Sequence, residues 1–179
     1  MDKLIRKKNN MEHQIIKLPP QDFYKKCSDI WDTVKHEQFA KQFEQELYSG
    51  NRIAYIYQID GENIAEISIV FDTDDPDYTI EKQRAYISHL VVKHEYRRKG
   101  IGKELVRFII DKAVEMGYKE LSIGVDLNNY PAIKLYVDCG FDKVIFIGKD
   151  EQGEYLKLLK IISPREEVKI NDSQSIYNR

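Results

Sequence analysis

The eight residues Tyr96-Arg97-Arg98-Lys99-Gly100-Ile101-Gly102-Lys103 (YRRKGIGK) contain four cations and two glycines. They lie between a strand-like stretch at 85–93 (AYISHLVVK) and an amphipathic, helix-like stretch at 101–116. The segment therefore falls at a helix N-terminus, where unpaired backbone N–H groups and the helix dipole favour an anion. Gly100 and Gly102 lack a Cβ, so an oxyanion can approach the backbone closely. This glycine loop (residues 96–103) predicts a diphosphate site.

The composition limits the class of protein. With 179 residues, 42% hydrophobic and 32% charged, the chain predicts one domain at 1–162 and a polar tail at 163–179. A net charge of −2 provides no global basic field, so no nucleic-acid partner is expected. No run approaches the ~20 apolar residues of a membrane span or resembles a signal peptide, which predicts a cytoplasmic protein without a membrane partner. Cys27 and Cys139 form no CxxC pair, which argues against a metal site and a disulfide framework.

Periodicity and turn residues around the glycine loop predict a mixed sheet. Alternating or β-branched stretches predict strands at 13–18, 52–59, 63–71, 85–93, 121–125, 141–147 and 154–162. Helical patterns predict two helices within 21–48, one at 101–116 and one from 129 to 139. The fold class is therefore α/β, with a mixed, mostly antiparallel central sheet of about seven strands flanked by about four helices.

Two common phosphate-binding motifs fit the loop poorly. A Walker loop needs a glycine where Arg97 stands and a Ser or Thr where Glu104 stands. A Rossmann fingerprint needs a small residue where Leu105 stands, and its glycines directly after the strand. Asp126 imitates the ribose carboxylate of that fold, so a nucleotide-binding module stays an alternative.

Two motifs at a fixed separation resemble the GNAT superfamily of N-acetyltransferases. The matching residues are Arg97-x-x-Gly100-x-Gly102, the preceding Leu90-Val91-Val92, and Asn129-x-x-Ala132 followed by Leu135-Tyr136 and Gly140-Phe141. The resemblance covers about residues 50 to 160. It implies a GNAT fold, acetyl-CoA as the cofactor, and transfer of its acetyl group to an amine.

The resemblance also implies which residues contact the cofactor. They are Leu90, Val91, Val92, Arg97, Arg98, Lys99, Gly100, Ile101, Gly102, Lys103, Asn129, Ala132 and Tyr136. N–H groups from Arg98 through Lys103 would bind the pyrophosphate, with the cationic side chains helping at the 3′-phosphate. The backbone of Leu90 and Val92 would pair with the pantetheine arm like an added strand, in a gap where strands 85–93 and 121–125 splay apart. Asn129 would hydrogen-bond this arm or cap its helix, and both roles stay open.

Catalytic roles follow from the same resemblance. The Val92 N–H is the expected oxyanion donor, and Tyr136 is the expected general acid that protonates the departing thiolate. Tyr136 also falls on the apolar face of its predicted helix, so a core aromatic is the competing interpretation.

The general base is open. Strand alternation puts Tyr86, Ser88, Leu90 and Val92 on one face and Ile87, His89 and Val91 on the other. The resemblance implies that the face of positions 86 and 88 is turned toward the acceptor. His89 is therefore expected on the side away from the acceptor, as a histidine packed in the interior and not as the base. Many relatives carry a carboxylate where Ser88 stands. Ser88 or Tyr86 acting through water, Glu66, or free amine from solution are the remaining candidates.

Four carboxylates precede the cofactor strand, at Asp72, Asp74, Asp75 and Asp77. If this loop overhangs the acceptor site, then Asp74, Asp75 and Tyr86 contact a small cationic amine such as a polyamine, an aminoglycoside-like compound or an amino acid. Acidic loops are also often merely solvated. The alternatives are a non-catalytic acyl-CoA sensor and a protein lysine or N-terminal acetyltransferase. The strand 154–162 and the tail could support a homodimer.

Overall fold

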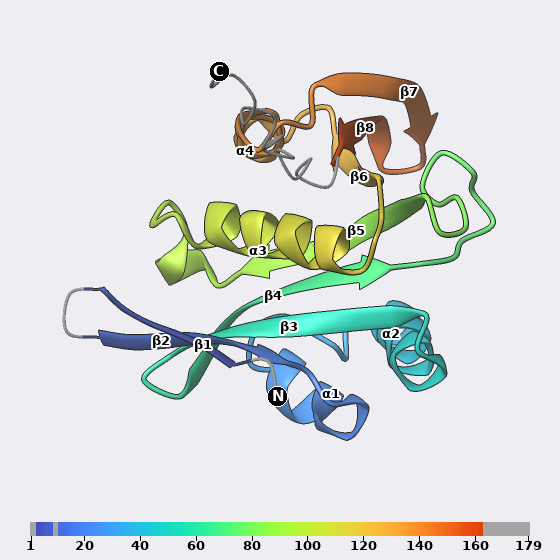
Figure 1. The fold of residues 1–179 in the computed structure, drawn as a ribbon. Helices are drawn as coiled ribbons and strands as arrows, with labels where there is room; N and C mark the ends of the chain where they lie inside the picture. Colours follow the sequence, from blue (N-terminus) through green and yellow to red (C-terminus); the bar gives the residue numbers. More distant parts are fainter. Residues whose placement is uncertain (1–2, 9–10, 163–179) are drawn as a thin grey trace, which may run out of the picture.

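A computed structural model describes residues 3–8 and 11–162 of the chain. In this part eight strands form one sheet, in the order β1-β2-β3-β4-β5-β6-β8-β7 (Figure 1). Their bounds are β1 (Lys3–Lys8), β2 (Met11–Lys17), β3 (Arg52–Ile59), β4 (Glu62–Val70), β5 (Arg84–Val92), β6 (Glu120–Asp126), β7 (Lys143–Asp150) and β8 (Gly153–Ile161). All neighbours are antiparallel except β5 and β6. The predicted mixed sheet is confirmed, with β1 added at its edge; the predicted tail at 163–179 lies outside the described residues.

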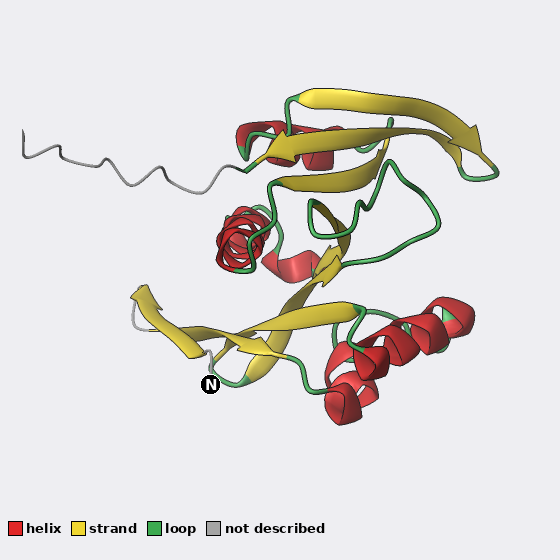
Figure 2. Cartoon of the chain, turned by 45° about the vertical axis from the view of Figure 1, so that its right-hand side comes forward, coloured by secondary structure: helices red, strands yellow, loops and turns green. Residues whose placement is uncertain are grey.

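Helices cover both faces of the sheet. They are the 3-10 turn η1 (Pro20–Asp22), α1 (Phe23–Cys27), α2 (Glu37–Ser49), the 3-10 turn η2 (His94–Tyr96), α3 (Ile101–Glu115) and α4 (Tyr130–Asp138). Figure 2 shows α1 and α2 together on one side of the strands and α3 on the other. No helix among the described residues is long and apolar enough to cross a membrane.

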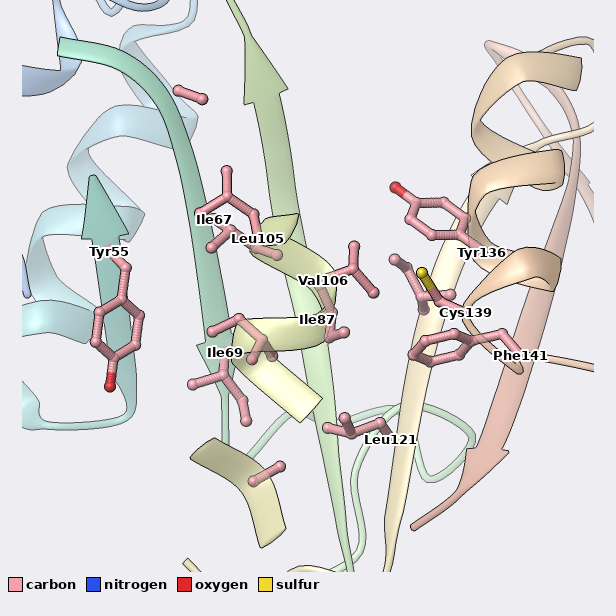
Figure 3. Packing of buried hydrophobic residues seen from close by; sticks show 14 of the residues in the cluster. Tyr55, Ile67, Ile69, Ile87, Leu105, Val106, Leu121, Tyr136, Cys139 and Phe141 are labelled. Atoms are coloured by element: carbon pink, nitrogen blue, oxygen red, sulfur yellow. The ribbon is translucent and has the colours of Figure 1, made fainter. Parts of the chain in front are cut away.

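The sheet separates two hydrophobic cores. On β3, Tyr55 belongs to the larger cluster with α3 and α4, whereas Ile56 belongs to the smaller cluster with α1 and α2. Figure 3 shows Leu105 and Val106 of α3 within the larger cluster. Strand alternation thus buries both faces of β3 and β4, and the buried positions of β4 include the polar residues Asn63, Glu66 and Ser68.

Two hairpin turns lie between strands that the sequence predicts, at 52–59 and 63–71 and at 141–147 and 154–162. Asp60 and Gly61 connect β3 to β4 with φ of 47° and 85°, the positive values that a two-residue hairpin turn requires. The closing hairpin was expected to turn over 148–153. Its strands run further, and only residues 151 and 152 separate β7 from β8.

A β-bulge interrupts β5. Ile67 lies opposite Leu90, whereas Ser68 lies opposite Ser88, so no residue of β4 lies opposite His89 in the strand pairing. Its φ of 65° falls in the left-handed region, which histidine adopts more readily than most residues. A bulge inserts one residue and bends the strand, so the alternation of side chains is broken at this position.

This bulge changes which face each side chain of β5 occupies. Ile87 packs in the α3/α4 cluster, and beyond the bulge Leu90 and Val92 pack against that same cluster. Val91 packs against the α1/α2 cluster, and the ring of His89 lies among aromatic rings of that cluster. The sequence prediction put Leu90 and Val92 on the same face as Ser88, and His89 on the face of Ile87. It was wrong, because strict alternation holds only in an unbroken strand.

The strands β5 and β6 separate halfway along their length. Their parallel pairing runs from Arg84 opposite Glu120 to Ile87 opposite Ile123 and ends there. Beyond this point β5 continues to Val92 and β6 to Asp126 without a shared ladder. The splay implied by the resemblance is therefore present, and it leaves one edge of β5 open.

Candidate active site

A cavity of about 440 Å³ lies where β5 and β6 separate. Five parts of the chain line it: Tyr78 from the loop before β5; Tyr86, Ile87, His89 and Leu90 from β5; Ile123, Gly124, Val125 and Asp126 from β6; Asn129, Ala132 and Tyr136 from the start of α4 and from α4 itself; and Asp150 and Tyr155 from the closing hairpin. Of the predicted site residues, Tyr86, Leu90, Asn129, Ala132 and Tyr136 belong to this lining. Elements from both halves of the sheet meet there.

The glycine loop leads directly into α3. Gly100 stands at the N-cap of α3 with φ 86°, where an L-residue would be strained. The Glu104 N–H donates to the Gly100 carbonyl at 3.0 Å and makes the first hydrogen bond of the helix. The preceding N–H groups of Ile101, Gly102 and Lys103 stand in the first turn, where no intrahelical acceptor exists. They form an anion-binding end that suits a pyrophosphate.

The cationic side chains of this loop have partners within the protein. Arg97 Nε donates to the Val92 carbonyl at 2.9 Å, and Lys99 Nζ lies 5.0 Å from the centre of the Tyr96 ring. Lys103 Nζ lies 3.8 Å from a carboxylate oxygen of Asp138. These contacts hold the positive charges around the helix end, and all of them are at the surface.

Gly102 has a packing role that sequence reasoning missed. A Cβ built on it would lie 3.0 Å from Leu135 Cδ1 on α4 and 3.9 Å from Leu90 Cδ2 on β5. The absence of a side chain therefore lets α3 approach α4, in addition to leaving room for an anion.

A Gly102→Val variant is expected to bind acetyl-CoA at least roughly tenfold more weakly and to melt at a lower temperature, because overpacking displaces the first turn of α3. Lys99→Ala is expected to cost on the order of 1 kcal/mol or less, since an exposed cation is screened. Calorimetric titration with acetyl-CoA and thermal unfolding of both variants measure this. Equal losses of affinity would contradict the assignment of binding to backbone geometry.

The open edge of β5 presents backbone donors to the cavity region. The Lys93 N–H donates to the Ile64 carbonyl at 3.0 Å, so position 93 points toward β4. Because N–H directions alternate along a strand, those of Leu90 and Val92 point to the opposite, open edge. This direction suits the pairing with an extended arm and the oxyanion contact that the resemblance implies.

The start of α4 contributes a cap. The Asn129 side-chain oxygen accepts a hydrogen bond from the Ala132 N–H at 3.2 Å, which is the helix-capping role. Asn129 also lines the cavity. The cap orients this side chain, and its contact with the pantetheine arm stays a prediction.

Tyr136 is both a residue of the hydrophobic core and a residue of the cavity lining. Only 7% of the residue is exposed, it belongs to the larger core cluster, and it also lines the cavity. In Figure 3 its hydroxyl extends from α4 toward β5, away from Cys139 and Phe141. Burial raises the pKa of the Tyr136 phenol, and the nearby Tyr86 adds to this rise. The phenol is therefore protonated at neutral pH, as a proton donor requires.

Ser88 is engaged elsewhere. Its hydroxyl accepts from Arg52 Nη1 at 3.2 Å, and Arg52 Nη1 also donates to Ser68 at 2.6 Å. The guanidinium continues to Glu46, with Nε 2.8 Å from a carboxylate oxygen, and lies 4.1 Å from the centre of the Phe43 ring. Ser88 is thus part of a buried polar network and is absent from the cavity lining among the described residues.

The acidic loop is partly neutralised within the chain. Lys157 Nζ on β8 lies 2.6 Å from Asp75 and 3.0 Å from Asp77, and only 5% of the lysine side chain is exposed. These pairs tether the loop to the sheet. Asp74 is exposed and Asp75 is paired, and the cavity lining includes neither.

Two other carboxylates line the cavity: Asp150, which sequence reasoning missed, and Asp126, which it considered only for a nucleotide-binding module. Asp126 at the end of β6 and Asp150 at the end of β7 line the cavity, beside the phenols of Tyr78 and Tyr155. Gly124 makes room for the first phenol, since a Cβ there would lie 2.5 Å from the Tyr78 hydroxyl. Asp150 comes from a part of the chain that sequence reasoning assigned to a turn, so no local signal marked it.

Comparison with known proteins identifies the family. The model of the acetyltransferase (GNAT) family matches residues 13–141. N-acetyltransferase 8 of Homo sapiens is 39% identical over 70 residues, which cover 39% of this chain and 30% of that protein. N-alpha-acetyltransferase 30 of Xenopus laevis is 42% identical over 66 residues, covering 36% of this chain and 24% of that protein. The matches thus span a third or less of these relatives.

Solved structures share the fold. A GNAT family acetyltransferase from Elizabethkingia anophelis, with acetyl-CoA bound, superposes with a TM-score of 0.61 at 18% identity, over 86% of this chain and 99% of that one. The family model covers most of the chain, including the glycine loop and the start of α4. The chain therefore belongs to the GNAT family of acetyl-CoA-dependent acetyltransferases.

Proposed function

We propose that the protein is an N-acetyltransferase that moves the acetyl group of acetyl-CoA to a primary amine of a small cationic acceptor, with Tyr136 as general acid. The observation that carries this proposal is a cavity at the splay of β5 and β6. Its lining contains Leu90 and Tyr136, which belong to the family motifs, together with the carboxylates of Asp126 and Asp150.

The residues present fit acetyl-CoA, which supplies an acetyl group activated as a thioester. The N–H groups at the start of α3 hold the pyrophosphate, and the open edge of β5 holds the extended arm. The Val92 N–H donates to the oxygen on which negative charge develops. Tyr136 gives its proton to the departing sulfur, and the phenol regains a proton from solvent.

The acceptor end of the cavity favours a positive charge. Asp126 is exposed and its side chain has no partner among the described residues, while one oxygen of Asp150 accepts two backbone hydrogen bonds at its own turn. The faces of Tyr78 and Tyr155 add cation–π surface. An amine that carries further cationic groups, such as a polyamine, suits this combination.

A screen of amines with acetyl-CoA tests the function. It should include polyamines, an aminoglycoside, free amino acids, and peptides with a free N-terminus or a lysine. Thiol release and the mass of the product measure transfer. Turnover of the small polycations above the peptides supports the proposal. Turnover of peptides alone indicates a protein acetyltransferase, and tight acetyl-CoA binding without any turnover indicates a sensor.

An Asp126→Asn variant is expected to raise KM for a polycationic acceptor roughly threefold to tenfold at low salt and less at high salt, because an exposed charge is screened. Asp74→Asn is the matched control in the acidic loop and is expected to leave KM within about twofold, since Asp74 lies outside the cavity lining. Initial rates at two ionic strengths measure both. A larger rise in KM for Asp74→Asn than for Asp126→Asn would indicate that the acceptor binds at the acidic loop.

A further inference from the structure

The bulge in β5 adds a histidine to the residues that line the cavity. We propose that His89, through Nε2, is the general base that takes the proton from the ammonium form of the acceptor, and that Glu66 is the positioning residue that orients its ring. The assignment rests on the proposed function, and it fills the role of general base, which the proposed function leaves unassigned.

The first step of the argument is the direction of the side chain. The bulge turns His89 to the α1/α2 face, where its ring lies 4.8 Å from the centre of Trp31 and 5.1 Å from that of Phe39. His89 also lines the cavity, together with Tyr136. Leu90 and α4, which contains Tyr136, pack on the opposite face of the sheet. The proton acceptor and the proton donor therefore reach one cavity from opposite faces, so the incoming amine and the departing thiolate have separate partners.

The second step is the division of labour between the two ring nitrogens. Nδ1 of His89 is in hydrogen-bond contact with Glu66 Oε2. An ionised Glu66 can only accept, so with this carboxylate charged the proton of the neutral ring lies on Nδ1. Nε2 then carries the lone pair. It has no hydrogen-bond partner among the described residues, and 20% of the His89 side chain is exposed whereas Glu66 is fully buried. This tautomer presents a proton acceptor toward the solvent side of the ring.

The third step is the charge around this pair. Burial raises the pKa of Glu66, while the His89 contact and then Arg52 oppose that rise. Arg52 is already paired with Glu46 at 2.7 Å. Cys27 on α1 also faces Glu66, and burial raises the pKa of its thiol, so it stays neutral. Of these groups only His89 gains positive charge by taking a proton, and the carboxylate stabilises the imidazolium so formed.

The proton is accounted for at each stage. It passes from the acceptor nitrogen to Nε2, which leaves a neutral amine and an imidazolium paired with Glu66. The amine then has the lone pair that attack on a carbonyl carbon needs. The imidazolium returns this proton to water through the exposed edge of the ring. The attacking nitrogen loses a second proton to solvent as the amide forms, which balances the proton that the Tyr136 phenol regains from solvent. Neither ring nitrogen changes its bonds to carbon, and no oxidant or metal is needed.

The decisive variant is His89→Asn. Asparagine tolerates the left-handed backbone of the bulge and cannot act as a base at neutral pH. We expect kcat/KM at pH 7 to fall roughly 100-fold. The loss should shrink as pH rises, because more of the acceptor is then deprotonated in solution. His36→Asn, at the exposed N-cap of α2, is the matched control and should retain wild-type kcat/KM.

Glu66→Gln tests the positioning role. We expect a loss of roughly tenfold in kcat/KM, and the acid limb of the pH profile should move to lower pH, because the imidazolium loses its counter-charge. A purely structural defect would lower the rate without moving this limb. The affinity for acetyl-CoA, measured by titration without acceptor, should stay within about threefold in both variants.

The outcomes separate this assignment from the proposed function. A wild-type protein that acetylates amines while folded His89→Asn retains its kcat/KM and pH profile overturns the base and leaves the function standing. A wild-type protein that turns over no amine overturns the function and this role with it. If His89→Asn fails to fold, Glu66→Gln decides. An acid limb of its kcat/KM pH profile that stays where it is in the wild type overturns the assignment of both His89 and Glu66.

Discussion

A Tyr136→Phe variant is expected to lose about 100-fold to 10,000-fold in kcat, the range that a general acid contributes. The ring remains and continues to pack beside Phe141, with the two ring centres 6.2 Å apart in the native protein. Only the proton donor is removed. The dissociation constant of acetyl-CoA should therefore stay within about threefold, since an effect confined to the transition state is absent from ground-state binding.

Steady-state rates with an acceptor from the amine screen, a binding titration and a melting curve on the same variant test this expectation. Tyr118→Phe is the matched control, because this half-buried phenol lies at the far end of α3 and outside the cavity lining. If kcat survives in Tyr136→Phe while acetyl-CoA affinity or thermal stability falls, the residue is a core aromatic, and water supplies the proton.

Arg52→Leu is expected to lower the free energy of unfolding by about 3 to 5 kcal/mol, because it leaves the buried partner of an ion pair uncompensated. Only 3% of the Arg52 side chain and 16% of the Glu46 side chain are exposed, and the pair is 2.7 Å apart. For a chain of this size the melting temperature should fall by roughly 6 to 20 °C. Urea unfolding followed by circular dichroism measures the loss.

The control is an exposed ion pair on α2, the helix that also contains Glu46. Lys41 and Glu37 are 2.6 Å apart, but their side chains are 62% and 68% exposed, so solvent screens the pair and Lys41→Ala should leave the free energy of unfolding nearly unchanged. The double variant Arg52→Leu with Glu46→Leu should recover part of the loss, because it leaves no unpaired carboxylate. A loss in Arg52→Leu no larger than in Lys41→Ala would mean that the buried network contributes little to stability.

Much of the fold and part of the site followed from local patterns. The hairpin turn at Asp60, the helix start after Gly100 and the helix end at Gly117 each depend on backbone angles that neighbouring residues dictate. The glycine loop and the position of Tyr136 belong to the same class, because both lie at fixed offsets within one strand-loop-helix or one helix. The strand β1 was missed although its partner β2 adjoins it in the sequence, because its residues KLIRKK are mostly charged and show no strand-like apolar alternation.

The acceptor side of the site did not follow from local patterns. Lys157 neutralises Asp75 across 82 positions of the chain, so the acidic loop that the sequence offered as a cation site already holds a cation. Asp150 reaches the cavity only because the closing hairpin is longer than its turn residues suggested. Each of these facts depends on which strands pair and where they end.

The sequence by itself determined the order of the elements, the mixed sheet and the anion-binding helix start, because each depends on periodicity or on a few neighbouring residues. The tertiary structure decided which side chains face the acceptor. The bulge at His89 arises from a shift in pairing between β4 and β5, and it joins His89 to Glu66 across 23 positions. The sequence of β5 alone does not reveal this shift, because the register depends on how the two strands pair.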